Sequence, residues 1–309
     1  MSARAESRSR SARVAAQAKI NLRLCMLARG TTGYHELETI FLKLALADDV
    51  VVRVTPGTRT LDVEGDVDRG ALGPAEHNLA WRAATGYAER AAWPAGFAIA
   101  LRKHVPIGAG LGGGSADAAA VLRALDALAP EPLGEPALLE IAQGLGADVP
   151  FLTSSSALAL AWGRGQRLLA LEPPEEREVL LVVPPFAVNT ADAYRWFSES
   201  TDWARHEQPA GVLRPETLHE WPTLASLATN DFRTVVHGRY PMLDDVEAHL
   251  RALGCDPVSL SGSGSTVFGV LPRGRRADAG ALARDAAMGG SRVLLTRTAS
   301  AVAPVIGAD

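Results

Sequence analysis

Five glycines fall within seven residues, between a strand-like segment and an alanine-rich one, and this feature most constrains the fold. The stretch reads Gly-Ala-Gly-Leu-Gly-Gly-Gly-Ser over residues 108–115. Glycine lets backbone N–H groups approach a ligand without an intervening Cβ. The N-terminus of the following helix, expected over 116–128, adds unpaired donors and a partial positive charge. An ordinary turn needs one or two glycines, so the pattern favours a cradle for a polyphosphate.

Two well-known phosphate loops fit this stretch poorly. Its glycines have the G-x-G-x-x-G spacing of dinucleotide-binding loops, but such a loop should follow directly on a buried parallel strand. Here Lys103, His104 and Pro106 intervene, and the strand expected at 97–101 alternates as in a one-sided antiparallel sheet. The sequence has no Gly-Lys-Ser/Thr, which excludes a Walker loop. A nicotinamide-dependent oxidoreductase remains the weaker alternative.

The order of elements predicts an α+β chain rather than a doubly wound one. Its 309 residues suffice for two domains of about 150 residues each. Strands and helices mix without regular βαβ alternation, and the Pro- and Glu-rich segment 172–178 is a plausible linker. We expect strands at 18–24, 39–46, 50–54, 97–101, 179–183, 257–260, 266–271 and 292–296, and helices at 78–91, 116–128, 135–144, 190–197, 224–237 and 242–253.

Charge and cysteine content argue against several classes of protein. The net charge of −4 gives no basic surface for nucleic acid, and no apolar run approaches the roughly 18 residues of a membrane span. Cys25 and Cys255 are far apart and in no metal-ligand spacing, which favours a reducing compartment, the cytoplasm. The Arg- and Ser-rich residues 1–14 are expected to be a disordered basic tail, with a transit segment as the alternative. The oligomeric state stays open.

The residues from Pro106 to Ala119 resemble the phosphate loop of the GHMP kinases. Ala-Lys-Ile-Asn-Leu at 18–22 and Gly-Tyr-His at 33–35 resemble one branch of that family, which phosphorylates a methylerythritol linked to cytidine diphosphate in isoprenoid biosynthesis. The segments 146–151 and 261–265 occur there in the same order, so the likeness spans roughly residues 15–300.

This resemblance implies a two-domain fold and an ATP-dependent small-molecule kinase. The N-terminal α+β nucleotide domain would cover residues 15–160 and a ferredoxin-like C-terminal domain residues 161–309. The 2-hydroxyl of the cytidyl diphosphate substrate would receive the γ-phosphoryl group of ATP.

The resemblance also gives catalytic roles to Lys19 and Asp148. Asp148 would accept the proton of the attacking hydroxyl, and Lys19 would pair with Asp148 and stabilise charge in the transfer. Without the resemblance, a helix cap is the commoner role for a carboxylate such as Asp148, and Lys19 could be an edge-strand residue whose ammonium reaches solvent.

The remaining site residues are carried over from the same resemblance. His35 would bond the cytosine edge, Tyr34 would form its pocket and Tyr194 would stack on the base. ATP use implies Mg²⁺, for which the sequence offers no evident carboxylate cage; Ser115, phosphate oxygens and water would be its ligands. The substrate would contact Asn21, Tyr34, His35, Thr190 and Tyr194. The nucleotide would contact Asn78, Leu79, Lys103, Pro106, Gly108, Gly110, Leu111, Gly112, Gly113, Gly114 and Ser115, although a solvent-exposed Lys103 is a competing interpretation.

Three residues depart from the family's pattern. Gln17 replaces a usual proline, Thr32 a usual aspartate, and Trp162 stands where arginine or glutamate is frequent. None of the three is a proposed catalytic position, so the departures concern the rim of the substrate site and not the reaction. Another GHMP kinase, such as homoserine kinase, and an inactive nucleotide-binding module are the alternatives. Gly-Tyr-His argues against the former, and the presence of Lys19 and Asp148 argues against the latter.

Overall fold

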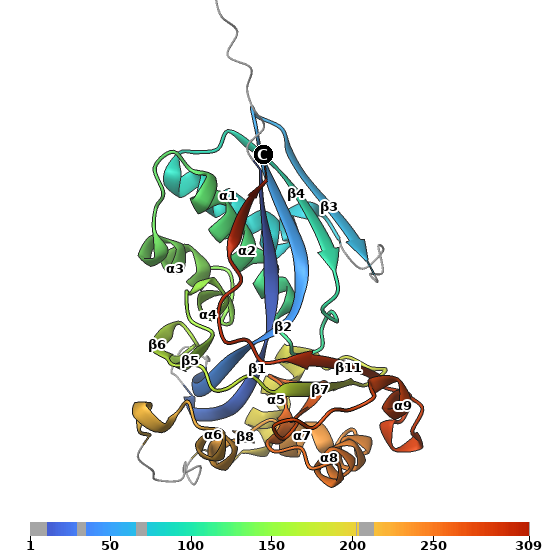
Figure 1. Cartoon of the computed structure of the whole chain (residues 1–309). Coiled ribbons are helices and arrows are strands. Elements are labelled where there is room, and N and C mark those ends of the chain that lie inside the picture. The colour runs from blue at the N-terminus through green and yellow to red at the C-terminus, as the bar shows by residue number, and fades with distance from the viewer. Residues whose placement is uncertain (1–10, 30–34, 66–72, 202, 204–212, 309) are drawn as a thin grey trace, which may run out of the picture.

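The structure, a computed structural model, describes residues 11–29, 35–65, 73–201, 203 and 213–308. Two sheets dominate it, and Figure 1 shows the helices α1 to α4 on one side of the larger sheet and the second sheet below, across its lower end. No helix in the described part of the chain combines the length and the apolar character that crossing a bilayer requires.

The larger sheet is built on two long strands that pair antiparallel along most of their length. Its main order is β12-β1-β2-β4-β3, with β5 and β6 continuing from β2 and β8 lying beside β1. The strands are β1 (Ser11–Arg29), β2 (His35–Thr55), β3 (Arg59–Gly65), β4 (Gly96–Lys103), β5 (Leu158–Gly163), β6 (Arg167–Leu171), β8 (Thr229–Asn230) and β12 (Val305–Ala308). The covering helices are α1 (Leu79–Ala91), α2 (Gly113–Leu128), α3 (Glu135–Gln143) and α4 (Val149–Thr153).

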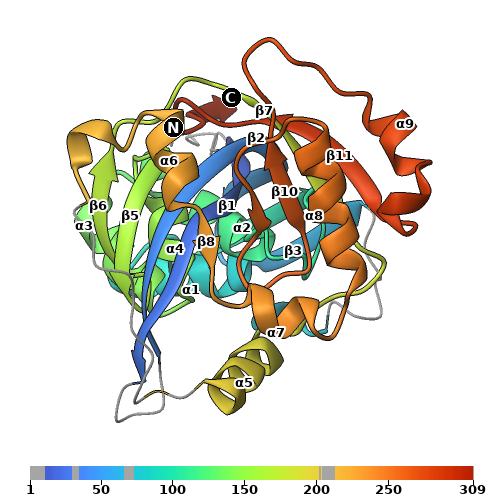
Figure 2. The same cartoon turned by 90° about the horizontal axis from the view of Figure 1, so that it is seen from below.

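The second sheet is antiparallel in the order β11-β7-β10-β9. Helices connect β7 to β9 and β10 to β11, which gives the ferredoxin-like arrangement and confirms the predicted α+β fold; Figure 2 shows α7 and α8 beside this sheet. Its strands are β7 (Glu178–Val183), β9 (Val258–Leu260), β10 (Val267–Val270) and β11 (Arg292–Arg297). The helices of this half are α5 (Thr190–Ser200), α6 (Trp221–Leu227), α7 (Arg233–His237), α8 (Met242–Ala252) and α9 (Ala279–Ala283).

A shared apolar core joins the two sheets and fixes the glycine loop between them. Ala18, Ile20 and Leu22, alternate residues of β1, are fully buried in this core. Ala109 and Leu111, the two apolar residues inside the glycine loop, pack into the same cluster. Burial of apolar area is the main favourable term in folding, so the loop is anchored by its side chains while its glycines stay available to a ligand.

The predicted elements differ from the structure in two places. The strands expected at 39–46 and 50–54 form the single strand β2, because Asp48 and Asp49 continue the pairing with β1. The carboxylate of Asp48 accepts hydrogen bonds from the backbone N–H groups of His104 and Val105. The helix expected at 224–237 is broken into α6 and α7 by β8, which pairs with β1.

The domain limits remain a prediction. Strands β5 and β6 carry the larger sheet past residue 160 to Leu171, and β12 returns from the far end of the sequence to pair with β1. Strand β1 begins at Ser11, four residues before the expected start of the first domain at residue 15; residues 1–10 lie outside the described part.

Candidate active site

A cavity of about 820 Å³ lies between the glycine loop, the start of α4 and the loop that follows β9. Its wall includes every predicted site residue except Tyr34 and His35. Tyr34 lies outside the described residues. The backbone of His35 begins β2, but its side chain is not among the described ones. The predicted residues in the wall are Lys19, Asn21, Asn78, Leu79, Lys103, Pro106, Gly108, Gly110, Leu111, Gly112, Gly113, Gly114, Ser115, Asp148, Thr190 and Tyr194.

The middle of the glycine loop interlocks with the Ser-Gly loop at 261–265. Gly110 has φ +78°, and a Cβ there would lie 2.2 Å from the carbonyl oxygen of Ser261. The Ser261 hydroxyl donates to the Gly110 carbonyl at 3.0 Å, and the Thr266 N–H donates to the Ala109 carbonyl at 3.3 Å. Only glycine can therefore occupy position 110, where the two backbones are in contact. The two loops together form one wall of the cavity.

Helix α2 opens into the cavity without a capping side chain. Its N-cap is Gly112, at φ +73°, and no side chain accepts from its first turn. The Gly112 carbonyl first accepts from the Ala116 N–H at 2.8 Å, so the N–H groups before Ala116 have no partner within the helix. The Ser115 hydroxyl, half-buried beside them, makes no hydrogen bond to any other described residue. Such an uncapped helix start is a site for an anion.

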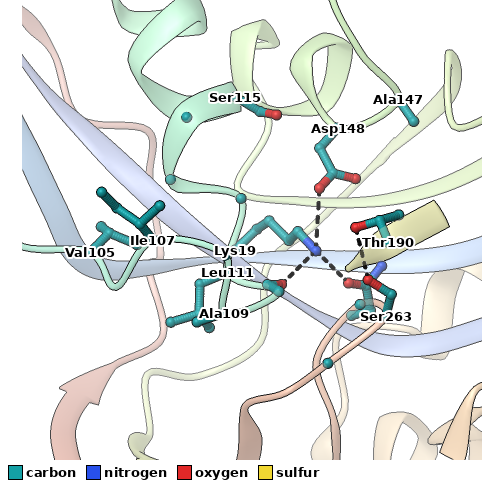
Figure 3. A pocket seen from close by; sticks show the side chains of 18 of the residues that line it. Lys19, Val105, Ile107, Ala109, Leu111, Ser115, Ala147, Asp148, Thr190 and Ser263 are labelled. Carbon is teal, nitrogen blue, oxygen red and sulfur yellow. Dashed lines mark hydrogen bonds and ion pairs between the residues drawn. The ribbon is translucent and has the colours of Figure 1, made fainter. Parts of the chain in front are cut away.

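Lys19 lies at the centre of the site with all three of its ammonium donors engaged. Its Nζ donates to Asn21 Oδ1 at 2.7 Å and to the Gly110 carbonyl at 2.9 Å, and lies 3.3 Å from Asp148 Oδ2 (Figure 3). The side chain is 2% exposed, so it does not reach solvent. Asn21 is fixed in turn, because its Nδ2 donates to Thr39 Oγ1 at 2.8 Å.

Asp148 occupies the N-cap position of α4 but does not cap the helix. No side-chain cap hydrogen bond is formed there, and the carboxylate is 29% exposed toward the cavity. Figure 3 shows the carboxylate directed at the Lys19 ammonium, with Ser115 of α2 nearby. The geometry therefore disagrees with the capping interpretation and leaves one carboxylate oxygen for a ligand.

A second buried lysine holds the other end of α4. Lys43, which pairs with Lys19 across β1 and β2, donates to the carbonyls of Leu152 at 3.1 Å and Ser154 at 2.9 Å. Its ammonium also lies 5.2 Å from the centroid of the Phe151 ring. Burial lowers the pKa of Lys43 to about 7, with a smaller effect in the same direction from Arg123 that Glu135 opposes. Helix α4, and with it Asp148, is thus positioned between two lysines of one sheet.

Lys103 is buried between two carboxylates, so the interpretation of it as a solvent-exposed side chain is wrong. Its ammonium donates to Asp117 Oδ2 at 2.5 Å and to Asp48 Oδ2. The other oxygen of Asp48 accepts hydrogen bonds from the backbone N–H groups of His104 and Val105, just before the glycine loop. Burial opposes its charge, but the two carboxylates outweigh burial and raise the pKa of Lys103. Burial raises the pKa of Asp117 to about 7, although Lys103 opposes that shift.

The opposite wall comes from α5 and the Ser-Gly loop. The hydroxyls of Thr190 and Ser263 are 3.1 Å apart, which ties the start of α5 to that loop (Figure 3). Tyr194 packs edge-on against Phe232, with ring centroids 4.8 Å apart. Burial, with a smaller contribution from Asp148, raises the pKa of Tyr194 to about 12. Its ring is thus already held by an aromatic neighbour at the cavity wall.

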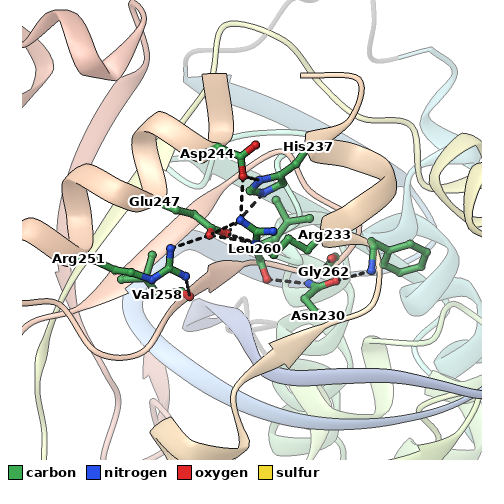
Figure 4. Close-up of polar contacts among 10 residues, drawn as sticks. Asn230, Arg233, His237, Asp244, Glu247, Arg251, Val258, Leu260 and Gly262 are labelled. Atoms are coloured by element: carbon green, nitrogen blue, oxygen red, sulfur yellow. Dashed lines mark hydrogen bonds and ion pairs between the residues drawn. The ribbon is translucent and has the colours of Figure 1, made fainter. Parts of the chain in front are cut away.

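Asn230 fixes the Ser-Gly loop from behind. Its Nδ2 donates to the carbonyls of Leu260 and Gly262, both at 2.8 Å, and its Oδ1 accepts from the Phe232 N–H (Figure 4). The same figure shows α7 and α8 joined by Arg233, which bonds the fully buried Glu247 at 3.0 Å. Asn230 therefore supports this wall of the cavity from its position in β8.

Sequence reasoning missed several residues of this site. The residues not predicted are Asp48, Asp117, Thr39 and Ser263. The sequence did contain a signal for Asp117, because it is an isolated acidic residue in the otherwise apolar start of α2. Of the departures from the family pattern, Gln17 bonds the segment before β12, accepting from the Ala303 N–H at 2.7 Å. Trp162 lies on β5 opposite Glu38, and Thr32 lies outside the described residues.

Comparisons with known proteins agree with this geometry. Residues 78–156 match the model of the GHMP kinases N terminal domain, and residues 216–289 match that of the GHMP kinases C terminal. A 4-diphosphocytidyl-2-C-methyl-D-erythritol kinase of Desulfotalea psychrophila is 38% identical over 84% of this chain and 85% of its own length.

Two solved structures resemble the chain over nearly its whole length. A crystal structure of 4-(cytidine 5'-diphospho)-2C-methyl-D-erythritol kinase has a TM-score of 0.71 at 34% identity, covering 93% of this chain and 98% of that one. Homoserine kinase from Cytophaga hutchinsonii has a TM-score of 0.67 at 17% identity, covering 99% of this chain and 100% of that one. The second likeness bears on the fold alone.

Proposed function

The chain belongs to the 4-diphosphocytidyl-2-C-methyl-D-erythritol kinases, a branch of the GHMP kinases, and we propose how its cavity transfers the γ-phosphoryl group of ATP to the 2-hydroxyl of that substrate. One observation carries the assignment of the reacting centre. The Lys19 ammonium lies 3.3 Å from a carboxylate that does not cap its helix, in the same cavity as the uncapped start of α2.

The nucleotide occupies the side of the cavity formed by the glycine loop. The first N–H groups of α2 bind the phosphates, since they have no partner within the helix. Asn78 and Leu79, at the start of α1, and Lys103 line the same cavity and contact the rest of the nucleotide. The Asp48 carboxylate keeps the entry to the loop in place through its two backbone hydrogen bonds.

The transfer itself depends on Asp148 and Lys19. Asp148 accepts the proton of the attacking hydroxyl as the oxygen approaches phosphorus, which makes that oxygen a better nucleophile. Lys19 holds the Asp148 carboxylate in place and offsets negative charge on the phosphoryl group between the two substrates. Because Asn21 and the Gly110 carbonyl bind the same ammonium, it is preorganised before substrates arrive.

Mg²⁺ fits the residues present in one limited way. Ser115 places a half-buried hydroxyl, with no other hydrogen-bond partner among the described residues, next to the phosphate site. Ser115 would therefore hold the ion together with phosphate oxygens and water, and the ion would neutralise phosphate charge. Among the described residues no group of three or more His, Cys, Asp or Glu side chains stands ready for a metal.

The acceptor binds on the side of Asn21, Thr190 and Tyr194. Tyr194 offers a ring held against Phe232 for stacking on the cytosine. His35 and Tyr34 would bind the same base, as the resemblance implies. We further propose domains covering residues 15–160 and 161–309, and a cytoplasmic location. Cys25 and Cys255, both buried and free, suit a reducing compartment.

A direct assay tests this function. The protein is incubated with ATP, Mg²⁺ and the cytidyl diphosphate substrate, and ADP and a phosphorylated product are followed by mass spectrometry. Homoserine and mevalonate are offered in parallel. Turnover of one of these in place of the cytidyl substrate would overturn the assignment, and binding of ATP with no turnover of any acceptor would favour an inactive module.

Gly114→Asp tests the phosphate cradle. Gly114 lies in the first turn of α2, where a Cβ would meet only Leu79, at 3.9 Å, so the fold has room for a side chain. An acid at a helix start stabilises the free protein but repels bound phosphate. We expect a Kd for ATP about tenfold higher than in the matched neutral variant Gly114→Asn, which corresponds to about 1.4 kcal/mol. Isothermal titration calorimetry and thermal melting give the two readouts. Equal ATP affinities in the two folded variants would contradict phosphate binding at this turn.

His35→Ala tests the recognition of cytosine. Removing a hydrogen bond to the base, remote from the reacting atoms, costs about 0.5–3 kcal/mol, depending on what is left unpaired. Binding energy made equally in the ground and transition states appears mainly in KM. We expect KM for the cytidyl substrate to rise, with KM for ATP and kcat changing much less. Steady-state kinetics with each substrate varied in turn measures this. A histidine that only packs the loop would instead lower the melting temperature and leave both KM values unchanged.

A further inference from the structure

A second cavity, of about 960 Å³, opens beside the first and meets it next to Asp148. The two share four lining residues, Leu37, Ala147, Arg164 and Tyr194. The described lining of the second cavity includes no residue of the glycine loop, and Ala147 directly precedes the proposed base. The second cavity therefore adjoins the acceptor side of the reaction.

Arg164 stands at this junction on a tight turn between β5 and β6. Gly163 and Gly165, on either side of it, have φ values of +75° and +97°. A Cβ on Gly165 would lie 2.8 Å from the Ala147 carbonyl oxygen, so the turn is seated directly against the segment that leads into Asp148. The Arg164 N–H donates to Gln166 Oε1 at 2.7 Å, which closes the turn. The backbone of Arg164 is thus fixed where the cavities join.

Among the described residues, four cationic side chains line the two cavities: those of Lys19, Lys103, Arg164 and Arg195. Lys19 pairs with Asp148, and Lys103 lies between Asp48 and Asp117. In the second cavity Arg195 bonds Asp192 at 2.7 Å on the exposed surface of α5. Arg164 places a positive charge at the junction, beside the segment that leads to the proposed base.

We propose that Arg164 binds the diphosphate of the acceptor substrate. This inference rests on the proposed function, from which the diphosphate follows. A guanidinium is a planar fork that donates to two oxygens of a phosphate at once. With the diphosphate at Arg164, the linked alcohol lies beside Asp148 and the cytidine extends toward Tyr194, which lines both cavities.

The test compares binding of cytidine, CMP and CDP, without catalysis, by isothermal titration calorimetry. In the wild type each added phosphate should lower Kd. In Arg164→Gln the Kd for CDP should rise about tenfold or more, the usual effect of losing charge-assisted hydrogen bonds, while the Kd for cytidine stays within about twofold. Arg164→Lys, which keeps the charge but not the fork, should fall between the two.

Arg167→Gln is the matched control. It removes the same charge from the same hairpin, at the exposed first residue of β6, outside the lining of both cavities, and should leave all three affinities unchanged. The assignment to Arg164 would be wrong if Arg164→Gln kept the wild-type preference for CDP over cytidine. It would also be wrong if Arg167→Gln raised the Kd for CDP as much as Arg164→Gln did. If the wild type bound neither cytidine nor CDP, the proposed function itself would fail, and this result is distinct from the first two.

Discussion

Asp148→Asn is expected to lower kcat by about 10²–10⁴-fold, the usual contribution of a general base, while ATP binds almost as before. The substitution keeps the shape of the side chain and an oxygen that can accept from Lys19, which lies 3.3 Å away in the native site. It removes only the ability to take a proton. Single-turnover kinetics with saturating ATP and acceptor measures the chemical step directly.

Asp126→Asn provides the control for this variant. Asp126 accepts from the Tyr87 hydroxyl at 3.0 Å and the Leu133 N–H at 2.7 Å, away from the lining of the reacting cavity, so its loss should cost stability and not kcat. A kcat for Asp148→Asn within a few-fold of the wild type would exclude Asp148 as the base. A comparable loss of kcat in Asp126→Asn would point to general damage instead.

Lys19→Met is expected to lower kcat by about 10²–10³-fold, the range seen when a preorganised donor to developing charge is removed. Methionine is similar in length and suits a buried position, since Lys19 is 2% exposed. The change leaves Asp148, Asn21 and the Gly110 carbonyl without their shared partner. Stopped-flow or quench-flow measurement of ADP formation gives the rate, and thermal melting gives the stability.

The double variant Lys19→Met with Asp148→Asn separates a joint role from two independent ones. Residues in contact that act as a unit give losses that do not add. We expect the double variant to lose little more kcat than the worse single variant. Fully multiplicative losses would mean that the ion pair has no common function, whatever the effect of each residue alone.

Much of the candidate site was predictable because it depends on local patterns. Alternation in β1 places Lys19 and Asn21 on one face, opposite the apolar Ala18, Ile20 and Leu22. The glycine cluster predicted a loop that approaches a ligand through its backbone, and the structure gives positive φ at Gly108, Gly110 and Gly112. The proximity of Lys19 to Asp148 was predicted from the resemblance alone, because the two residues are 129 positions apart and no local pattern links them. The roles of these residues remain proposals.

The missed features depend on partners from distant segments. Lys103 could be predicted as exposed or as a ligand contact, because nothing near it in sequence shows that Asp48 and Asp117 surround its ammonium. The break in the helix expected at 224–237 has the same kind of cause. Asn230 leaves helical geometry to bond the Leu260 and Gly262 carbonyls, and the competing contacts become visible only in three dimensions.

The pairing of β1 with β12 has a consequence for the order of synthesis. Ser11 to Val14 bond on one side to β2, which is made soon afterwards, and on the other side to residues 305–308, which are made much later. During translation this edge of the sheet is therefore exposed until residues 305–308 have left the ribosome. An open strand edge can pair with another chain. A nascent chain stalled shortly before Val305 should thus be more prone to aggregate than the released protein, although its cavity residues are already complete.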